Sequence, residues 1–211
     1  MIEISYINVT NFENAMRGMR HPLDSHDKGD TKVYKVQPFM GTNTTLVGAN
    51  DFELAMKLIR SGSDHRKFMR QIFVSMDITA PLYWWKEMDT YKVSTTANST
   101  STMHTLHKKG IVPELFSVEN LSDTMETVFE NYCSILERKR LEYVSTKKKS
   151  AWRELIQMLP SSFNQTRTWT GTYESLRSIY HARKKHKLQE WLDFCEVIEF
   201  QMPYYEFITA T

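Results

Sequence analysis

The sequence predicts an α+β fold in which a β-sheet and several long helices form one domain spanning residues 1–211. Between residues 72 and 79, strongly apolar side chains alternate with more polar ones, which is typical of a β-strand with one buried face. From Ser122 onward, apolar side chains recur every three to four residues, which is typical of a long helix. The composition, 41% apolar and 25% charged, is that of a globular chain with a buried core.

The N-terminal segment predicts a strand followed by a short helix. Ile2, Ile4 and Tyr6 alternate with polar residues and therefore indicate an opening strand. A helix is expected to follow Asn11 and to end before His21-Pro22, because the residue before a proline is biased away from helical backbone angles.

Three elements are expected next: a polar turn over residues 22–32, extended structure over residues 33–47, and a second helix. Asn50 is expected to cap this helix, because a glutamate, Glu53, stands three residues later. Gly62 is expected to end it.

The remainder of the chain predicts helices and one loop that is rich in hydroxyl groups. Pro81 suits the first turn of a helix, where its missing N–H has no cost, and this helix is expected to continue to Lys92. Residues 94–102 are mostly Ser and Thr, which compete for backbone hydrogen bonds, so a loop is expected there. The long helix should lead into a solvated basic connection at residues 147–149, and from Ala151 to the end the chain is expected to be helical.

Charge and cysteine content narrow the classes of function. A net charge of +2 is too small for a protein that binds polymeric nucleic acid through its backbone. Cys133 and Cys195 are far apart in apolar contexts, so we expect core thiols rather than a disulfide or a catalytic pair. His104 and His107 lack a third ligand at a matching spacing, and no metal site is predicted. With neither a membrane span nor a signal segment in the sequence, the expected location is the cytoplasm.

Arg183 is the most informative single residue. Together with Leu176, Ile179 and Tyr180 it follows helical spacing, which places the base of an arginine on an apolar stripe. A guanidinium in such a place usually holds a carboxylate, a phosphate or a polarised carbonyl, because burying it without a partner is costly. A structural ion pair, or a head group that reaches solvent, explains the same pattern.

A second candidate region combines Glu87, Tyr91 and Lys92 with the Ser/Thr loop that follows. Hydroxyls, backbone amides and one lysine within a short stretch match the oxygens of a phosphate. A solvated loop that binds nothing would have the same composition. His65 is a third candidate, since it follows a helix end and has basic neighbours, but an exposed loop histidine is the simpler interpretation.

Read together, these segments resemble the flavin-dependent thymidylate synthases. FVSMDITAPLYWWKEMDTYKV resembles the strand, Ala-Pro pair and helix that lead into the family's RHR signature, and TTANSTSTMH occupies the place of its S-x-N-E-x-S-x-R-Y loop. In MLPSSFNQTRTWTGTYESLRSIYHARKKHKLQEW, the Leu-Pro pair, Trp169-Thr170, Ser175-Leu176, Arg183 and Gln189 follow the family's order. The GSDHRKF loop stands where the family has G-H-x-T-P-F-E-H, so the likeness extends over most of the chain.

The resemblance implies a thymidylate synthase-like α+β fold with a mixed sheet, assembled as a homotetramer whose subunits share sites for FAD and the pyrimidine deoxynucleotide dUMP. It also implies methylation at C5, with NADPH reducing the flavin and methylenetetrahydrofolate supplying the one-carbon unit. Arg183 matches the family arginine that lies against the nucleotide base and is therefore the candidate catalytic residue. His65 matches a flavin-contacting histidine, and Glu87 stands where the family has a nucleotide-contacting glutamine.

The sequence departs from the family pattern in two places. Thr90-Tyr91-Lys92 replaces RHR, so Tyr91 and Lys92 are the candidate FAD contacts, with a single positive charge and without the fork of an arginine. In the next loop the phosphate-binding arginine is absent, which leaves Asn98, Ser99 and Ser101 as candidate nucleotide contacts.

These departures leave alternatives open. One is a flavin-dependent enzyme that acts at C5 of a pyrimidine deoxynucleotide, and another is a nucleotide-binding or nucleotide-sequestering protein without the redox step. A third is a structural or interaction protein that keeps only the scaffold. Glu87 favours a cytosine-type base over uracil, because an ionised carboxylate accepts hydrogen bonds but cannot donate them.

Overall fold

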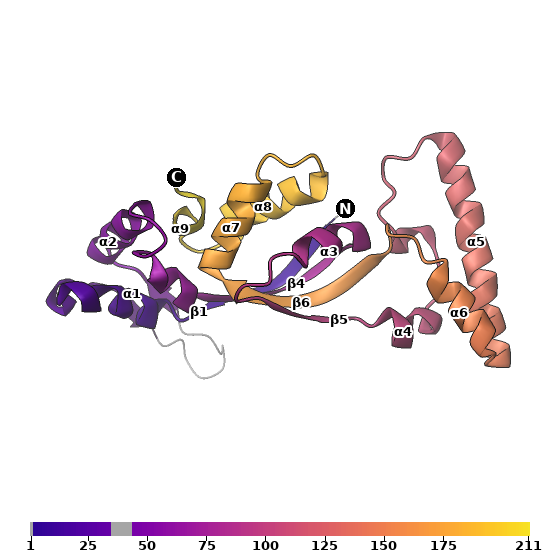
Figure 1. Ribbon diagram of the computed structural model, residues 1–211, viewed down its shortest axis with the longest axis horizontal. Helices are drawn as coiled ribbons and strands as arrows, with labels where there is room; N and C mark the ends of the chain where they lie inside the picture. Colours follow the sequence, from indigo (N-terminus) through magenta and orange to yellow (C-terminus); the bar gives the residue numbers. More distant parts are fainter. Residues whose placement is uncertain (1, 35–43) are drawn as a thin grey trace. The chain divides into compact units, whose positions relative to one another are not determined.

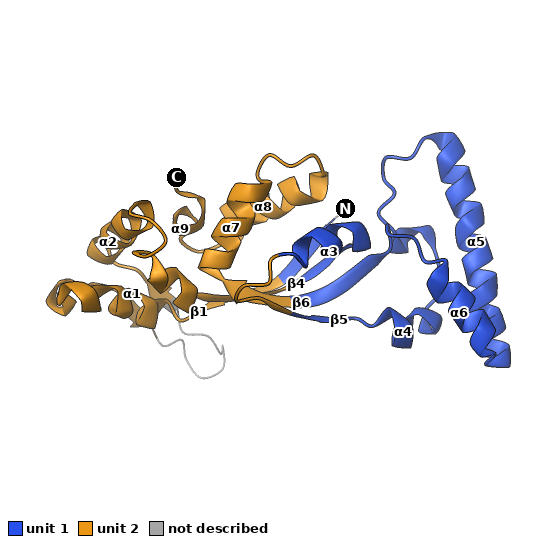
Figure 2. Cartoon of the chain, viewed as in Figure 1, with its two compact units in different colours: residues 1–5, 77–90, 97–168 blue, residues 6–76, 91–96, 169–211 orange. Residues whose placement is uncertain are grey.

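The structure is a computed structural model that describes residues 2–34 and 44–211. The chain forms two compact units, each assembled from distant parts of the sequence (Figure 2). Unit 1 consists of Met1–Ser5, Asp77–Thr90 and Ala97–Thr168, and unit 2 consists of Tyr6–Met76, Tyr91–Thr96 and Trp169–Thr211. No single cut in the sequence separates the two units, and one domain over residues 1–211 stays a prediction.

A four-stranded sheet has the order β1-β4-β6-β5, and all four strands contribute residues to both units (Figure 1). The strands are β1 (Glu3–Thr10), β4 (Phe73–Pro81), β5 (Thr96–Ser99) and β6 (Asn164–Thr172). The sheet and the helices together confirm the α+β class. The prediction of helix alone after Ala151 was wrong, because it overlooked β6, whose alternating threonines favour a strand. The loop expected at residues 94–102 likewise contains the short strand β5.

Strand β4 confirms the period-two pattern. Val74, Met76 and Ile78 are at most 1% exposed, whereas Phe73 on the other face is 47% exposed. One face of the strand therefore lies entirely in the core.

Strand β1 has a different phase from the one expected. Tyr6 was assigned to the same face as Ile2 and Ile4, but it is 85% exposed, and Ile7 is half-buried instead. The reason is a backbone with φ of 51° at Tyr6, which interrupts the alternation and turns the following side chains to the other face.

Unit 2 contains five helices among its described residues, together with a two-stranded antiparallel sheet. The helices are α1 (Phe12–Arg20), α2 (Ala49–Arg60), α7 (Tyr173–Arg183), α8 (Gln189–Gln201) and α9 (Glu206–Thr209). Strand β2 (Lys32–Tyr34) pairs with β3 (Thr44–Leu46), and the rest of the segment expected to be extended, residues 35–43, lies outside the described residues. The boundaries of α1 agree with the prediction.

The N-terminus of α2 is capped differently from the expected pattern. The backbone N–H groups of Asn50 and Asp51 donate to the carboxylate of Asp30, at 2.9 and 3.0 Å, so Asn50 is inside the helix rather than its cap. Gly48 precedes the helix, and a Cβ there would lie 2.1 Å from Asp30 Cγ. Because Asp30 is distant in sequence, the local cap pattern could not reveal it.

A buried ion pair joins α1 to α2. Arg20 and Asp51 are 4% and 2% exposed, and Arg20 Nε donates to Asp51 Oδ1. The other carboxylate oxygen accepts from the N–H and the hydroxyl of Thr31. Burial alone would raise the pKa of Asp51, but the hydrogen bonds from Thr31 and Arg20 together lower it below its ordinary value.

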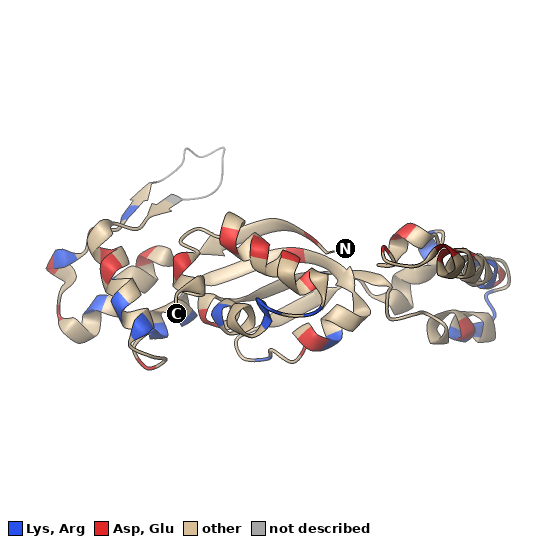
Figure 3. Ribbon diagram, turned by 90° about the horizontal axis from the view of Figure 1, so that it is seen from above, with Lys and Arg blue, Asp and Glu red and all other residues tan. Residues whose placement is uncertain are grey.

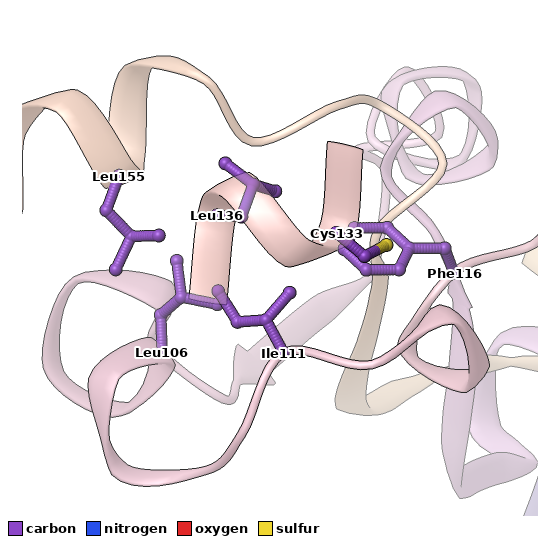
Figure 4. Packing of buried hydrophobic residues seen from close by; sticks show 6 residues of the cluster. All are labelled: Leu106, Ile111, Phe116, Cys133, Leu136 and Leu155. Atoms are coloured by element: carbon purple, nitrogen blue, oxygen red, sulfur yellow. The ribbon is translucent and has the colours of Figure 1, made fainter. Parts of the chain in front are cut away.

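Unit 1 contains α3 (Leu82–Met88), α4 (Thr102–Thr105), α5 (Asp123–Thr146) and α6 (Lys149–Gln157). Helix α5 begins after Ser122, as expected. A hydrophobic cluster joins α5 and α6 to the segments between α4 and α5 (Figure 4), and its buried members are Leu106, Ile111, Phe116, Cys133, Leu136 and Leu155.

Three helical predictions need correction. Helix α3 ends at Met88 rather than near Lys92, and the long C-terminal helix is two helices, α7 and α8, separated by residues 184–188. On α5 the apolar pattern has two faces, because Leu136 is buried while Met125 and Ile135 are about half exposed. Within residues 2–34 and 44–211, no helix combines the length and apolarity needed to cross a membrane.

We predict that Asp51→Asn lowers the free energy of unfolding by about 3–5 kcal/mol at neutral pH, because Arg20 keeps its buried charge and loses its counter-charge. Urea unfolding measures this, with Glu53→Gln on the exposed part of α2 as the control. The pKa of Asp51 is lower in the folded protein than its ordinary value of 3.8. The stabilisation by ionised Asp51 is therefore complete above pH 3.8 and is lost as the pH falls through the pKa of the folded protein. The two proteins should therefore converge in acid, and a difference that persists there would contradict the assignment.

Candidate functional site

Helix α7 places Arg183 at its C-terminal end. The helix begins with a reciprocal cap, in which Thr172 Oγ1 accepts from Ser175 N and Ser175 Oγ accepts from Thr172 N at 2.8 Å. Leu176 and Ile179 are fully buried, and Arg183 is half-buried on the same stripe. The position expected from helical spacing is confirmed.

Two aromatic residues from other segments hold the guanidinium of Arg183. Arg183 Nε donates to the hydroxyl of Tyr91 at 2.8 Å, and Tyr91 lies in the turn after α3. The guanidinium carbon is 4.7 Å from the ring centroid of Trp191, in the first turn of α8, and 5.5 Å from that of Tyr91. Trp191 is fully buried, and its ring contacts that of Tyr91 edge-on, at a centroid distance of 6.3 Å.

This arrangement fixes the plane of the guanidinium. Each contact of the guanidinium with an aromatic face contributes about 0.5–2 kcal/mol of attractive interaction free energy. The hydrogen bond at Nε sets the rotation of the guanidinium about its side chain. The four N–H groups on Nη1 and Nη2 form the fork with which an arginine recognises paired acceptors. Such a group can bind a carbonyl and an adjacent ring atom of a planar base, or two oxygens of a phosphate.

The segment after Arg183 is strongly basic. Lys184, Lys185 and Lys187 follow it directly, and His186 is held in place because its Nδ1 accepts from the N–H of Leu188 at 3.2 Å. The helix that follows, α8, carries acidic residues and neither Lys nor Arg (Figure 3). These ammonium groups and that of exposed Lys92 belong to unit 2, and ammonium groups can bind the oxygens of a phosphate.

His65 lies at the other end of α7. It is exposed in the turn after α2, and its neighbour Arg66 forms an ion pair with Glu174 at 2.9 Å, in the first turn of α7. Glu174 and Arg183 are nine positions apart on the helix, which is a rise of about 14 Å. The structure therefore brings Tyr91 to Arg183 but not His65.

The remaining predicted contacts belong to unit 1. Glu87 is half-buried in the last turn of α3, and its backbone carbonyl accepts from Thr90. Asn98 and Ser99 are exposed on β5, and Ser101 caps α4, where its carbonyl accepts from the Thr105 hydroxyl at 2.7 Å. The exposed side chains of Asn98 and Ser99 agree with the expected polar surface, although this part is strand, and Ser101 is half-buried.

Sequence reasoning missed two residues of interest. Trp191 was not singled out, and nothing in the local pattern shows that its ring meets a guanidinium eight positions earlier. Arg167 on β6 was not singled out, yet its guanidinium carbon is 4.2 Å from the ring centroid of Trp85 and it pairs with Asp89 at 2.8 Å. The signal available in the sequence was a positively charged residue, Arg167, within a segment of alternating threonines.

No protein-family model matches the sequence, and no curated protein matches it. Among solved structures, the chain is similar to thymidylate synthase X (ThyX) from Helicobacter pylori, crystallised with FAD and dUMP, with a TM-score of 0.72 and 15% identity over 98% of this chain and 95% of that chain. It is also similar to the UMP/dUMP methylase PolB from Streptomyces cacaoi, bound with 5-Br dUMP, with a TM-score of 0.60 and 13% identity over 94% of this chain and 88% of that chain. The chain therefore has the fold of the flavin-dependent thymidylate synthases, as the sequence segments indicated.

Both cysteines are buried free thiols, as expected. Burial, with a smaller effect of Glu199, raises the pKa of Cys195 to about 11. Burial and the nearby Glu114 and Glu130 also raise the pKa of Cys133. Since the thiolate is the nucleophile, neither position is arranged for covalent catalysis.

We predict that neither thiol reacts within minutes with Ellman's reagent in the native protein at pH 8, because both are buried and protonated. In guanidinium chloride, two equivalents should react at once. One equivalent released from the native protein would show that a thiol is accessible and activated.

Proposed function

We propose that this protein is a flavin-dependent thymidylate synthase-like enzyme that acts at C5 of a pyrimidine deoxynucleotide, dUMP or a related one. The reaction would use reduced FAD and a folate one-carbon donor, with NADPH as the reductant. The fold supports this proposal, and the observation that carries it is the fixed, half-buried guanidinium of Arg183 between Tyr91 and Trp191.

In this proposal Arg183 binds the nucleotide base and polarises its carbonyl. A guanidinium that withdraws electron density from a ring carbonyl makes the conjugated ring more reactive, and a preorganised group does so without reorganisation during the reaction. Tyr91 and Trp191 act as positioning residues, because they orient the guanidinium without being required to touch the base. Glu87, Asn98, Ser99 and Ser101 are proposed to contact the nucleotide through hydrogen bonds.

Lys92 and Tyr91 are the proposed contacts with FAD on the segment that replaces RHR, and His65 is proposed as a further flavin contact. The basic segment after Arg183 supports anion binding in the same unit, since it supplies positive charge that the signature lacks. When bound, FAD would supply the redox chemistry of the reaction.

A second candidate function is a nucleotide-binding or nucleotide-sequestering protein that has no redox step. Two observations favour it: the replacement of RHR by Thr90-Tyr91-Lys92, and the engagement of the Tyr91 hydroxyl by Arg183. Binding of a pyrimidine nucleotide without retention of flavin would identify this case.

We also propose a homotetramer. Helix α5 supports self-association, because Met125, Val128 and Ile135 are spaced by three and seven residues and are 53%, 57% and 47% exposed. Apolar side chains with this spacing form a seam that another helix can cover.

We predict that the purified protein retains FAD through gel filtration and that Lys92→Ala weakens this retention, since it removes a cation from the proposed flavin contact. The visible absorption spectrum measures it, with Lys86→Ala in α3, also exposed, as the matched control. A protein that stays colourless after incubation with FAD would favour the second candidate function.

Arg183→Ala is expected to weaken dUMP binding at least about tenfold, because a hydrogen bond to a charged group contributes about 1.5–3 kcal/mol. Calorimetric titration measures this, with Arg60→Ala at the exposed end of α2 as the control. Tyr91→Phe should give a smaller loss, since it removes the hydrogen bond at Nε and keeps the ring. Unchanged affinity in Arg183→Ala would refute the proposed role of this residue.

Glu87→Gln is expected to shift the preference from dCMP toward dUMP severalfold, because an amide both donates and accepts whereas a carboxylate only accepts. Competition titrations of the two nucleotides measure the ratio, with Glu196→Gln on the exposed part of α8 as the control. A wild-type protein that already prefers dUMP severalfold would argue against this role of Glu87.

A further inference from the structure

Unit 1 contains a cavity of about 840 Å³. Its wall combines the start of β6, helix α4 and its extension, and the segment that leads from Pro113 to α5. This volume lies within the range of about 300–1,000 Å³ that is usual for pockets that bind small molecules. The cavity therefore has the size of a ligand site.

The interior of the cavity is apolar. Leu106 and Phe116 belong both to its wall and to the hydrophobic cluster of unit 1, where they are 7% and 4% exposed (Figure 4). Val118 and Phe163 add half-buried apolar surface beside them. A ligand in this cavity would exchange contacts with water for contacts with aliphatic and aromatic side chains. This exchange contributes about 25 cal/mol to the binding free energy for each Å² of apolar surface that is buried.

Several polar groups in the wall already bind one another. Gln165 Nε2 donates to the carbonyl of Thr100 at 2.8 Å, and the hydroxyls of Thr79 and Thr166 are 2.7 Å apart. Asn164 Oδ1 accepts from a serine hydroxyl at 2.9 Å. A strongly polar ligand would have to break these hydrogen bonds, so the wall favours a ligand with an apolar body.

The charged residues of the wall are all exposed, and carboxylates predominate. Two ammonium groups, Lys108 and Lys109, are outnumbered by the three carboxylates of Glu3, Glu114 and Glu126, and the fourth carboxylate of the wall, Glu119, already has an interaction partner. An excess of negative charge at the edge of an apolar space attracts a cation and repels a phosphate.

The cavity is distinct from the proposed nucleotide contacts. Its wall includes Thr100 and Thr102 but none of Asn98, Ser99 and Ser101. The charge of the edge is also unsuitable for a nucleotide monophosphate, whereas the basic segment after Arg183 suits one. The cavity thus needs a ligand of another chemical class.

We propose that this cavity is a binding site for a small molecule with an apolar aromatic body and a positively charged amine. The body fills the space beside Phe116 and Phe163, and the amine lies at the edge among the carboxylates of Glu114 and Glu126. The site is independent of flavin and of the nucleotide, so its failure leaves the proposed function untouched.

Dansylcadaverine and dansylglycine test the proposal, because they carry the same fluorophore with opposite charge. We expect the cationic probe to bind with enhanced fluorescence, to saturate at one per chain and to bind at least tenfold more tightly than the anionic probe. Equal binding of the two probes, tighter binding of dansylglycine, or no binding of either would overturn the proposal.

Three variants localise the binding. Val118→Trp and, separately, Leu121→Trp should fill the cavity and reduce the affinity for dansylcadaverine more than tenfold, with the folded state verified by urea unfolding. Glu114→Gln combined with Glu126→Gln should abolish most of the preference for the cation, while Glu130→Gln, an exposed glutamate of α5 outside the wall, should preserve it. Unchanged binding in both tryptophan variants would place the probe elsewhere and refute the site.

Discussion

The burial of one face of β4 is the constraint on which the rest of the sheet depends. The strand lies between β1 and β6, and its inward side chains, from Val74 to Ala80, are at most 1% exposed. Because strand side chains alternate with a period of two, a shift of one residue in the register of β4 would expose this entire set. The strand ends at Pro81, and α3 begins at the next residue and leads to the segment that carries Tyr91.

Two arginines show how burial separates a structural role from a functional one. Arg20 is 4% exposed and pairs with buried Asp51, so its charge joins α1 to α2. Arg183 is half-buried, and aromatic rings from two other segments hold its plane. A half-buried guanidinium whose orientation is fixed in this way is suited to ligand recognition, because little conformational entropy is lost on binding.

The candidate site was only partly predictable from the sequence. Helical spacing was sufficient to place Arg183 on the apolar stripe of its helix, since that relation is local. Its contact with Tyr91 joins residues 92 positions apart, and the ring of Trp191 comes from a helix that the sequence pattern did not separate from α7. The cavity of unit 1 gave no signal at all, because its wall collects residues from four separated segments.

The sequence by itself determined the features that depend on periodicity: strand β4, the start of α5 at Ser122, and the fold class. Tertiary structure decided the others. Asp30 rather than Asn50 caps α2, Tyr6 turns outward because of a left-handed backbone, and β6 replaces part of an expected helical region. The physical reason is the same in each case. Periodicity reports which face of an element is buried, whereas caps, strand partners and ring contacts come from residues distant in sequence, which only the folded chain brings within hydrogen-bonding or van der Waals distance.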